Sequence, residues 1–361
     1  YRAQGYKTGL FTSPHLVSLR ERVRVNGRMI PKRSVAAFMD RHRKKLLERK
    51  LSFFEVVTAM ALEFFSRAEV EIAIIETGLG GRLDATNVLT PKLTITTDIS
   101  RDHLEILGTT IRKIAREKAG ILKKSVPHLV GLLPETAERV MREHCRRMGS
   151  RLFKLNPQDF AFNPEKLSLD FKYNGMALSG VRPSLIGPQQ LKNTALVLKA
   201  VSILNERGLR VSKRAILHGI SHTDWPGRFQ IVEYRDKPVH IFDVCHNAAG
   251  VEAFAQTFRI RFPGKRARII MGFVKRKEHQ KMFNSLSKVA DSYALVPLRT
   301  GRSINLSELI RNIDWKDVPF KKYGTLKTAY KKTLRNSERG DIVAVIGSHY
   351  LVGEFFDKIG V

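Results

Sequence analysis

The sequence predicts an α/β fold with two domains built on largely parallel sheets. The chain has 361 residues, which at roughly 150 residues per domain suggests two domains. Apolar residues make up 43% of it, enough to bury a sizeable core. Short β-branched runs alternate with stretches of helical periodicity, and this alternation is typical of βαβ units with parallel strands.

The first half of the chain begins this pattern. Apolar spacing predicts helices at 53–67, 111–122 and 135–148, and β-branched runs predict strands at 70–77, 92–97 and 126–131. Thr109 or Thr110 is expected to cap the helix at 111–122, because a hydroxyl there can accept a hydrogen bond from the first turn. The continuous apolar run Ile72–Ile75 fits a strand buried on both faces.

The sequence pattern changes at the start of the second half. Short alternating segments flank Asn174-Gly175, which predicts a β-hairpin, and residues 188–205 predict a helix. Strands are expected at 230–234 and 239–242, around a charged turn. We place the domain boundary there, which divides the chain into residues 1–236 and 237–361. The remainder predicts helices at 248–260, 278–289 and 325–335 and strands at 267–271, 293–296 and 342–346.

Composition excludes several classes of protein. No stretch approaches the roughly 18 uninterrupted apolar residues of a membrane span. Two cysteines, Cys145 and Cys245, cannot build a disulfide framework or a zinc ribbon. The N-terminal residues do not resemble a secretory signal, so we expect a reducing cytoplasm.

The net charge of +30 raises the hypothesis of a nucleic-acid partner. The basic residues are nevertheless spread along the chain. The densest cluster, residues 41–50, has helical spacing and predicts a solvated helix face. We therefore expect the charge to be a general surface property.

Polar residues follow several predicted strands, where open α/β sheets place their ligands. Glu76 ends one strand and starts a glycine-rich stretch that continues to Asn87. Its carboxylate would be either a Mg²⁺ ligand or the partner of Arg82. Ser13 and His103 also follow apolar runs, and each fits a structural role as well as a functional one.

Other candidates lie on a helix and in the second half. Lys118 shares a helix face with Ala115 and Ala119, which could point it into a cleft. Arg228 in a tight turn suits phosphate. Asp243 and His246 follow an apolar strand. For each of these an ordinary surface or turn role is the alternative.

Taken together, these segments resemble the folylpolyglutamate synthase/dihydrofolate synthase family, a branch of the Mur-ligase-like ATP-dependent amide ligases. The signature at 78–87, GLGGRLDATN, is highly specific. The other matching stretches follow the family's order along nearly the whole chain: 8–15, 21–27, 53–55, 102–108, 114–121, 226–229, 243–247 and 347–353.

The resemblance implies a P-loop-type ATPase domain followed by a smaller Rossmann-like domain, with the active site in the cleft between them. ATP would activate the carboxylate of a folate or dihydropteroate as an acyl phosphate. The amine of L-glutamate would then attack, giving an amide, ADP and phosphate. The family also suggests a monomer.

The resemblance further assigns roles to individual residues. Mg²⁺, at two sites, would be held by Ser13, Glu76 and His103. Lys118 matches a lysine that is carbamylated in the family, and with His246 it is the candidate catalytic residue. Nucleotide contacts would be Asn193, Arg228 and Asp243, and substrate contacts Ser52, Phe53, Phe54, Glu55, Leu83, Asp84 and Ala85.

Two features depart from the family. No G-x-x-x-x-G-K-[ST] phosphate loop occurs in the 361 residues. The family carries it on a strand-to-helix turn shortly before residues 5–9, so we expect a truncated ATPase domain with very weak ATP turnover, the alternative being a pseudoenzyme. Residues Arg276-Lys277-Glu278 differ in their first charge from the family's acidic–basic–acidic triplet. A cell-wall Mur ligase is the competing activity, and residues 53–55 and 83–85 argue against it.

Overall fold

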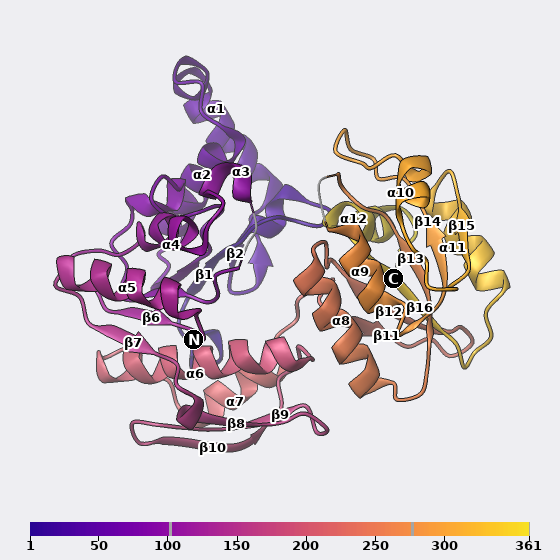
Figure 1. Cartoon of the computed structure of the whole chain (residues 1–361). Coiled ribbons are helices and arrows are strands. Elements are labelled where there is room, and N and C mark those ends of the chain that lie inside the picture. Colours follow the sequence, from indigo (N-terminus) through magenta and orange to yellow (C-terminus); the bar gives the residue numbers. More distant parts are fainter. Residues whose placement is uncertain (101–102, 276–277, 361) are drawn as a thin grey trace. The chain divides into compact units, whose positions relative to one another are not determined.

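The computed structural model describes residues 1–100, 103–275 and 278–360. The described residues divide into two compact units (Figure 1). The first unit comprises Tyr1–Phe162, Leu169–Arg182 and Lys192–Ser221, and the second comprises Asn163–Ser168, Pro183–Leu191 and His222–Val361. Residues 222–236, which we expected in the first domain, thus lie with the second unit. The reason is that their strand pairs with the sheet of that unit.

One sheet of the first unit has the strand order β3-β2-β1-β4. Its strands are β1 (Thr8–Phe11), β2 (Val23–Val25), β3 (Arg28–Met29) and β4 (Ile72–Ile75). Helices α1 (Lys32–Glu48) and α2 (Phe53–Arg67) connect β3 to β4, and the apolar side of α2 packs with Phe11 and Val23 in one core. Residues 41–48 of the basic stretch lie on α1, whose buried residue is Phe38, and Arg49 is the C-cap of that helix.

The expectation that β4 is buried on both faces is wrong. Ala73 is exposed, and Ile74 is 43% exposed. Within the described residues β4 is the edge strand of its sheet and pairs with β1 alone, while its Ile75 packs against the core that contains α2. An apolar run alone does not distinguish a central strand from an edge strand.

Parallel strands β5 (Thr94–Thr96), β6 (His128–Val130) and β7 (Leu152–Lys154) form another sheet of the first unit. Between them lie α3 (Leu104–Leu107), α4 (Ile111–Ala119) and α5 (Glu135–Arg147). The predicted cap of α4 is confirmed, because Thr110 Oγ1 accepts a hydrogen bond from the Lys113 amide at 3.2 Å. Ile114 on α4 and Met141 on α5 are buried in the core that these two helices share.

The predicted hairpin is confirmed. Strands β9 (Ser168–Tyr173) and β10 (Met176–Val181) are antiparallel, and β8 (Phe160–Asn163) lies beside β9. Asn174 and Gly175 at the turn have φ angles of 49° and 79°, the left-handed values that a two-residue hairpin turn requires. Helices α6 (Pro188–Glu206) and α7 (Lys213–Ser221) follow.

The second unit contains a sheet of order β11-β12-β16-β13-β14-β15. The strands are β11 (Gln230–Val232), β12 (Val239–Asp243), β13 (Ala267–Met271), β14 (Ala290–Leu295), β15 (Phe320–Lys322) and β16 (Ile342–Ile346). Only β11 runs antiparallel to its neighbour among these described strands. The helices are α8 (Ala248–Arg261), α9 (His279–Leu286), α10 (Leu306–Asn312), α11 (Leu326–Arg335) and α12 (His349–Lys358).

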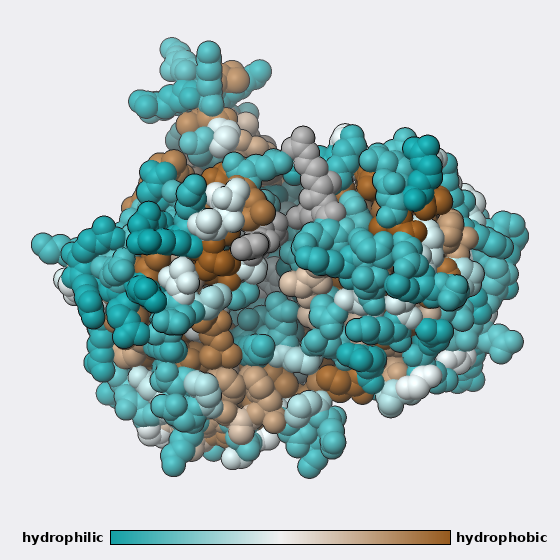
Figure 2. All heavy atoms as spheres, viewed as in Figure 1, coloured by the Kyte–Doolittle hydropathy of each residue, from teal (hydrophilic) through white to brown (hydrophobic). Residues whose placement is uncertain are grey.

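Every residue of β16 is buried, as expected for the centre of such a sheet. Short 3-10 helices complete the elements at Arg2–Gln4, Leu19–Arg22, Ala85–Val88 and Pro157–Asp159. None of the helices in the described ranges combines the length and apolar character needed to span a membrane. Figure 2 shows hydrophilic residues over much of the visible surface, as the charge of the chain implies.

Candidate functional site

Ser13 and Glu76 meet at the carboxyl ends of two parallel strands. Phe11 at the end of β1 pairs with Ile75 at the end of β4. The Ser13 amide donates to Glu76 Oε2 at 2.8 Å, and the Glu76 amide donates to the Phe11 carbonyl at 2.9 Å. Two of the three predicted metal ligands are thus adjacent.

Arg82, the alternative partner of Glu76, pairs elsewhere. Its Nε donates to Glu117 Oε1 at 3.1 Å. The positive charge near Glu76 is instead that of Arg22. Burial lowers the pKa of Arg22, and the nearby carboxylates of Glu76 and Glu21 oppose this shift.

Arg22 is a site residue that sequence analysis missed. Its Nε donates to His15 Nδ1 at 2.8 Å, and its guanidinium carbon lies 5.2 Å from the centroid of the Phe53 ring. It therefore lies between a predicted metal ligand, Glu76, and a predicted substrate contact. The sequence carried one signal: residues 21–27 belong to the resemblance without having a role assigned.

Glu21 fixes the loop that leads to Arg22. Its Oε2 accepts a hydrogen bond from the Leu16 amide at 2.8 Å, and its Oε1 accepts from the amides of Val17 and Ser18 at 3.0 and 2.6 Å. One carboxylate thus holds three consecutive amides. This arrangement explains how an irregular segment can place Arg22 reproducibly.

Asp84 folds the glycine-rich stretch back on itself. Its Oδ2 accepts hydrogen bonds from the Gly78 and Leu79 amides, both at 2.9 Å. Its Oδ1 accepts from the Thr86 amide at 3.0 Å and from the Thr86 hydroxyl at 2.6 Å. The carboxylate is buried, whereas the neighbouring Leu83 side chain is 81% exposed. Asp84 shapes the loop, and Leu83 is free to contact a ligand.

The same stretch packs closely on the last turn of α4. A Cβ atom on Gly120 would lie 2.3 Å from the Arg82 Cα, so only glycine fits. The Arg82 amide donates to the Glu117 carbonyl at 2.9 Å, and Asn87 Nδ2 donates to the Gly120 carbonyl at 3.0 Å. Because partly buried Lys118 lies on this turn, its backbone is held at a fixed position relative to the loop.

The four predicted substrate contacts at the start of α2 differ from one another in what their side chains contact in the structure. The Ser52 amide donates to Glu55 Oε2 at 2.7 Å, and the Glu55 amide donates to Ser52 Oγ at 3.3 Å. These bonds hold the Glu55 pKa below its usual value and form a capping box. Phe54 packs against Phe11, with ring centroids 5.8 Å apart. Phe53 is 57% exposed and can meet a ligand.

His103 has a left-handed backbone, with φ of 51° and ψ of 40°, and precedes α3. Residues 101 and 102 lie outside the described ranges, as do Arg276 and Lys277 of the altered triplet. Among the residues that the structure describes, no three His, Cys, Asp or Glu side chains gather as a metal site would require. The role of His103 as third metal ligand stays a prediction. The oxygen donors of Ser13 and Glu76 are of the type that Mg²⁺ prefers.

In the second unit, Asp243 organises the end of β12. Its Oδ2 accepts from the Phe229 amide at 2.8 Å and its Oδ1 from the Cys245 amide at 2.7 Å. Burial raises the pKa of Asp243, while these amides and the nearby charge of Arg228 oppose that shift. The arrangement joins the turn carrying Arg228, which is exposed, to the strand end.

His246 lies near the start of α8, and its ring centroid is 5.6 Å from that of His349 at the start of α12. The two histidines meet because β12 and β16 are parallel neighbours, with Asp243 opposite Ile346. His349 belongs to the matching stretch 347–353, to which the sequence analysis assigned no role. Asn193, the remaining predicted nucleotide contact, is exposed on α6 in the first unit.

Comparison with known proteins matches residues 44–201 to the Mur ligase middle domain and residues 227–349 to the Mur ligase glutamate ligase domain. The chain is 33% identical to the dihydrofolate synthase/folylpolyglutamate synthase of Bacillus subtilis, over 98% of this chain and 84% of that protein. It is similar to Escherichia coli FolC in complex with DHPP and ADP, with 30% identity and a TM-score of 0.86 over 99% and 83% of the two chains. A bifunctional folylpolyglutamate synthase/dihydrofolate synthase with Mn, AMPPNP and L-glutamate bound gives 26% identity and a TM-score of 0.86 over 100% and 84%.

Proposed function

The chain belongs to the folylpolyglutamate synthase/dihydrofolate synthase family of Mur ligases, and we propose that it joins L-glutamate to a folate or dihydropteroate carboxylate. It is an ATP-dependent ligase that forms an amide bond. The observation that carries the proposal is the Ser13–Glu76 contact at the ends of two parallel strands, beside Arg22. Oxygen donors and a cation there suit the joining of two anions, ATP and a carboxylate.

The metal chemistry rests on the first unit. We propose that Ser13, Glu76 and His103 hold Mg²⁺, at two sites, and that Lys118 carries a carbamate that adds an anionic oxygen. Oxygen ligands with one imidazole suit this ion. When bound, Mg²⁺ would neutralise charge on the phosphates and on the activated carboxylate. The hydrogen bond from the Ser13 amide would orient the Glu76 carboxylate for this task.

The substrate's aromatic ring system would lie against side chains that the structure leaves exposed. Phe53 and Leu83 both have large exposed apolar surfaces. Arg22 lies over the ring of Phe53 and can donate to oxygen or nitrogen acceptors of a bound ring. We propose that Asp84 acts by positioning Leu83 and Ala85, and that Ser52 and Glu55 act by holding the first turn of α2, with Phe54 packed behind it.

Nucleotide recognition would use Asn193, Arg228 and Asp243. A guanidinium in an exposed turn suits phosphate oxygens. The half-buried Asp243 carboxylate can accept from hydroxyl groups. We propose that His246 stabilises or moves a proton as the glutamate amine attacks, since histidine is the commonest general acid or base in enzymes.

The test is phosphate release with ATP, Mg²⁺, L-glutamate and either dihydropteroate or tetrahydrofolate, each omitted in turn. We expect release only when all components are present. Calorimetric binding of dihydropteroate is measured in parallel. A chain that binds neither pterin compound and releases phosphate with a cell-wall peptide precursor would refute the proposal.

We further propose that the protein is a monomer and that it is located in a reducing cytoplasm. The support for a reducing compartment is that Cys145 and Cys245 are both free and buried. Sedimentation at several protein concentrations tests the monomer.

A further inference from the structure

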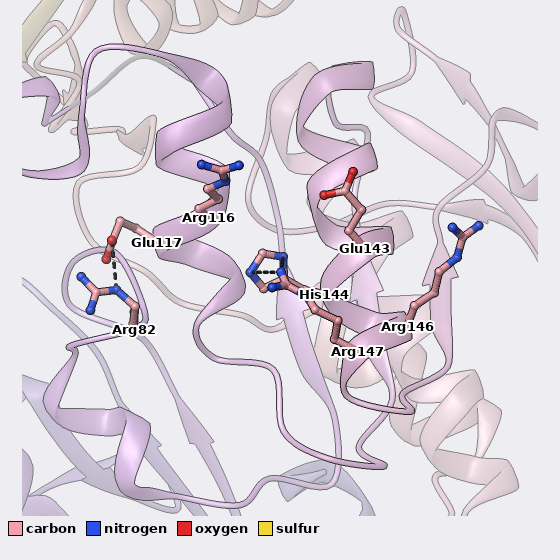
Figure 3. Close-up of a pocket in the computed structure, with 7 residues that line it drawn as sticks. All are labelled: Arg82, Arg116, Glu117, Glu143, His144, Arg146 and Arg147. Atoms are coloured by element: carbon pink, nitrogen blue, oxygen red, sulfur yellow. Dashed lines mark hydrogen bonds and ion pairs between the residues drawn. The ribbon is translucent and has the colours of Figure 1, made fainter.

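A pocket of about 760 Å³ lies on the first unit, and two of its lining residues, Arg82 and Glu117, are sequence neighbours of Leu83 and Lys118. It is lined by four arginines, two glutamates and a histidine, from α4, α5 and the loop that follows β4. Figure 3 shows Arg82 and Glu117 facing each other on one side, with His144 and Arg147 on α5 across from them. The volume lies in the range of small-molecule sites, roughly 300–1,000 Å³.

Positive charge exceeds negative charge in this pocket. Four guanidinium groups face two carboxylates, and one carboxylate, Glu117, is already paired with Arg82. In the part of the chain that the structure describes, neither Arg116 nor Arg146 forms an ion pair. A guanidinium group that lacks a carboxylate partner keeps its donors available for an anion.

His144 holds one of these arginines in place. Its Nδ1 donates to the Val140 carbonyl at 2.9 Å. The Arg147 Nη2 lies 3.0 Å from both ring nitrogens of His144, Nδ1 and Nε2 (Figure 3). The contact with the ring therefore restricts the orientation of the Arg147 guanidinium without removing its charge. Such pre-orientation lowers the entropy lost when a ligand binds.

The surrounding basic residues do not extend the pocket into a track for nucleic acid. Arg139 pairs with Glu135 at 3.1 Å, and Arg142 pairs with Glu138 one turn later on α5. Lys154 also pairs with Glu138, at 2.5 Å. Arg139, Arg142 and Lys154 are thus compensated locally, whereas Arg116 and Arg146 in the lining form no ion pair within the described residues. A nucleic-acid site would need a longer uncompensated stripe.

We propose that this pocket binds a small polyanion, a molecule that carries two or more phosphate or carboxylate groups. Arg116, Arg147 and the outer donors of Arg82 would contact its oxygens. The lining glutamates would repel any anion. A monoanion makes too few contacts with the arginines to offset this repulsion, so the pocket would favour polyanions. The proposal does not rest on the proposed ligase function.

The test is isothermal titration calorimetry in metal-free buffer at fixed salt, with inorganic pyrophosphate and with citrate in separate arms. The variant is R116Q/R147Q. The matched control is R112Q/R139Q, which removes the same charge from the same two helices outside the lining. We expect at least tenfold weaker binding of one probe in the pocket variant only, and an unchanged affinity for ADP with Mg²⁺. The probe that binds more tightly to the unmodified chain decides between phosphate and carboxylate.

Several results would overturn the proposal. These are no binding of either probe, equal losses in both double variants, or abolition of probe binding by saturating ADP, which would place the anion at the nucleotide site. A loss seen only with a single-stranded oligonucleotide, with a steep salt dependence, would replace the small ligand by nucleic acid. If R116Q/R147Q melts early, R116Q alone is used, because exposed Arg116 supports no ion pair within the described residues.

Discussion

The backbone amide of Ser13 donates a hydrogen bond to Oε2 of Glu76 at 2.8 Å, across 63 residues of sequence. The contact exists because β1 and β4 are parallel neighbours whose carboxyl ends share one edge of the sheet. It holds a carboxylate oxygen at the place where open α/β sheets bind ligands. The hydrogen bond orients Glu76 through the backbone, so a change in the Glu76 charge need not disturb the strand end.

Replacing Glu76 by Gln should therefore separate chemistry from folding. The amide oxygen of Gln can still accept from Ser13, but the negative charge that we propose holds Mg²⁺ is lost. We expect ligase activity to fall by about 100-fold or more, with a higher Mg²⁺ requirement and an unchanged melting temperature. Phosphate release against Mg²⁺ concentration measures this.

The matched control for this substitution is Glu71→Gln. Glu71 also accepts a backbone hydrogen bond, from the Lys7 amide at 2.6 Å, just before β4 begins. Its activity should match that of the unmodified chain. Equal Mg²⁺ dependence in the Glu76 variant and in the control would remove Glu76 from the metal site.

Gly78→Ala should weaken substrate binding through Phe54. A Cβ atom on Gly78 would lie 2.4 Å from Phe54 Cζ, so the ring must shift, and Phe53 and the first turn of α2 would shift with it. We expect a loss of stability of about 1–3 kcal/mol and a lower affinity for dihydropteroate. Chemical unfolding and calorimetry measure the two effects.

Gly219→Ala is the control for that glycine. No atom lies within 4 Å of the added Cβ, and Gly219 is inside α7. This variant should gain up to about 1 kcal/mol of stability with unchanged dihydropteroate binding. If both alanine variants bind dihydropteroate equally, the Phe54–Gly78 contact has no role in the substrate site.

The order of elements could be predicted from the sequence because periodicity is a local signal. The helix starting at Ile111 and the turn at Asn174-Gly175 were both anticipated, and the capping hydroxyl and the positive φ angles explain why. For Ser13 and Glu76, the sequence predicted that each residue follows a strand, but it did not predict that the two are in contact. Their hydrogen bond depends on the pairing of two strands separated by a pair of helices, which local patterns do not encode.

The role of Arg22 could not be predicted, since it depends on three contacts from distant segments: His15, Phe53 and Glu76. At Ser52 and Glu55 a structural role was overlooked, while their role as substrate contacts stays a prediction. The spacing S-x-x-E before an apolar run is a capping-box signal, and the structure contains that box. The family resemblance had directed attention to substrate contacts instead.

Lys199 is a charged residue inside an apolar helix, and its substitution should destabilise the first unit. Its Nζ donates to Asp159 Oδ2 at 2.6 Å, and both side chains are almost fully buried. Lys199→Met leaves the Asp159 charge buried and unpaired, so we expect a loss of about 3–5 kcal/mol. Urea unfolding monitored by circular dichroism measures it.

An exposed pair provides the comparison for Lys199. Arg139 and Glu135 lie on the surface of α5, so Arg139→Gln should cost between 0 and about 1 kcal/mol. The double variant K199M/D159N should recover part of the loss, because the buried charge is then removed. A loss below about 1 kcal/mol for Lys199→Met would show that Asp159 finds water or another donor.

His128 should make the stability of the first unit depend on pH. The ring is buried between the hydroxyls of Thr94, 2.8 Å from Nδ1, and Thr96, 3.2 Å from Nε2. Burial lowers the pKa of His128 from 6.5 to about 4, against a smaller opposing effect of Thr94. Between these values the unfolded chain binds a proton that the folded chain does not. The contribution of neutral His128 to the free energy of unfolding is therefore fully present above pH 6.5 and is lost as the pH decreases to about 4. At 1.36 kcal/mol per pKa unit, the loss is about 3 kcal/mol.

The difference between the unmodified chain and His128→Gln isolates this contribution, because carboxylates and the buried His240 titrate alike in both. Gln can keep a hydrogen bond to one threonine but has no proton to gain. We expect the free energy of unfolding of the variant to change less between pH 7 and pH 4.5, so the two curves converge as the pH falls. Parallel curves over that range would mean that the folded chain protonates His128 as readily as the unfolded chain, and the packing of Thr94 and Thr96 around a neutral ring would then be incorrect.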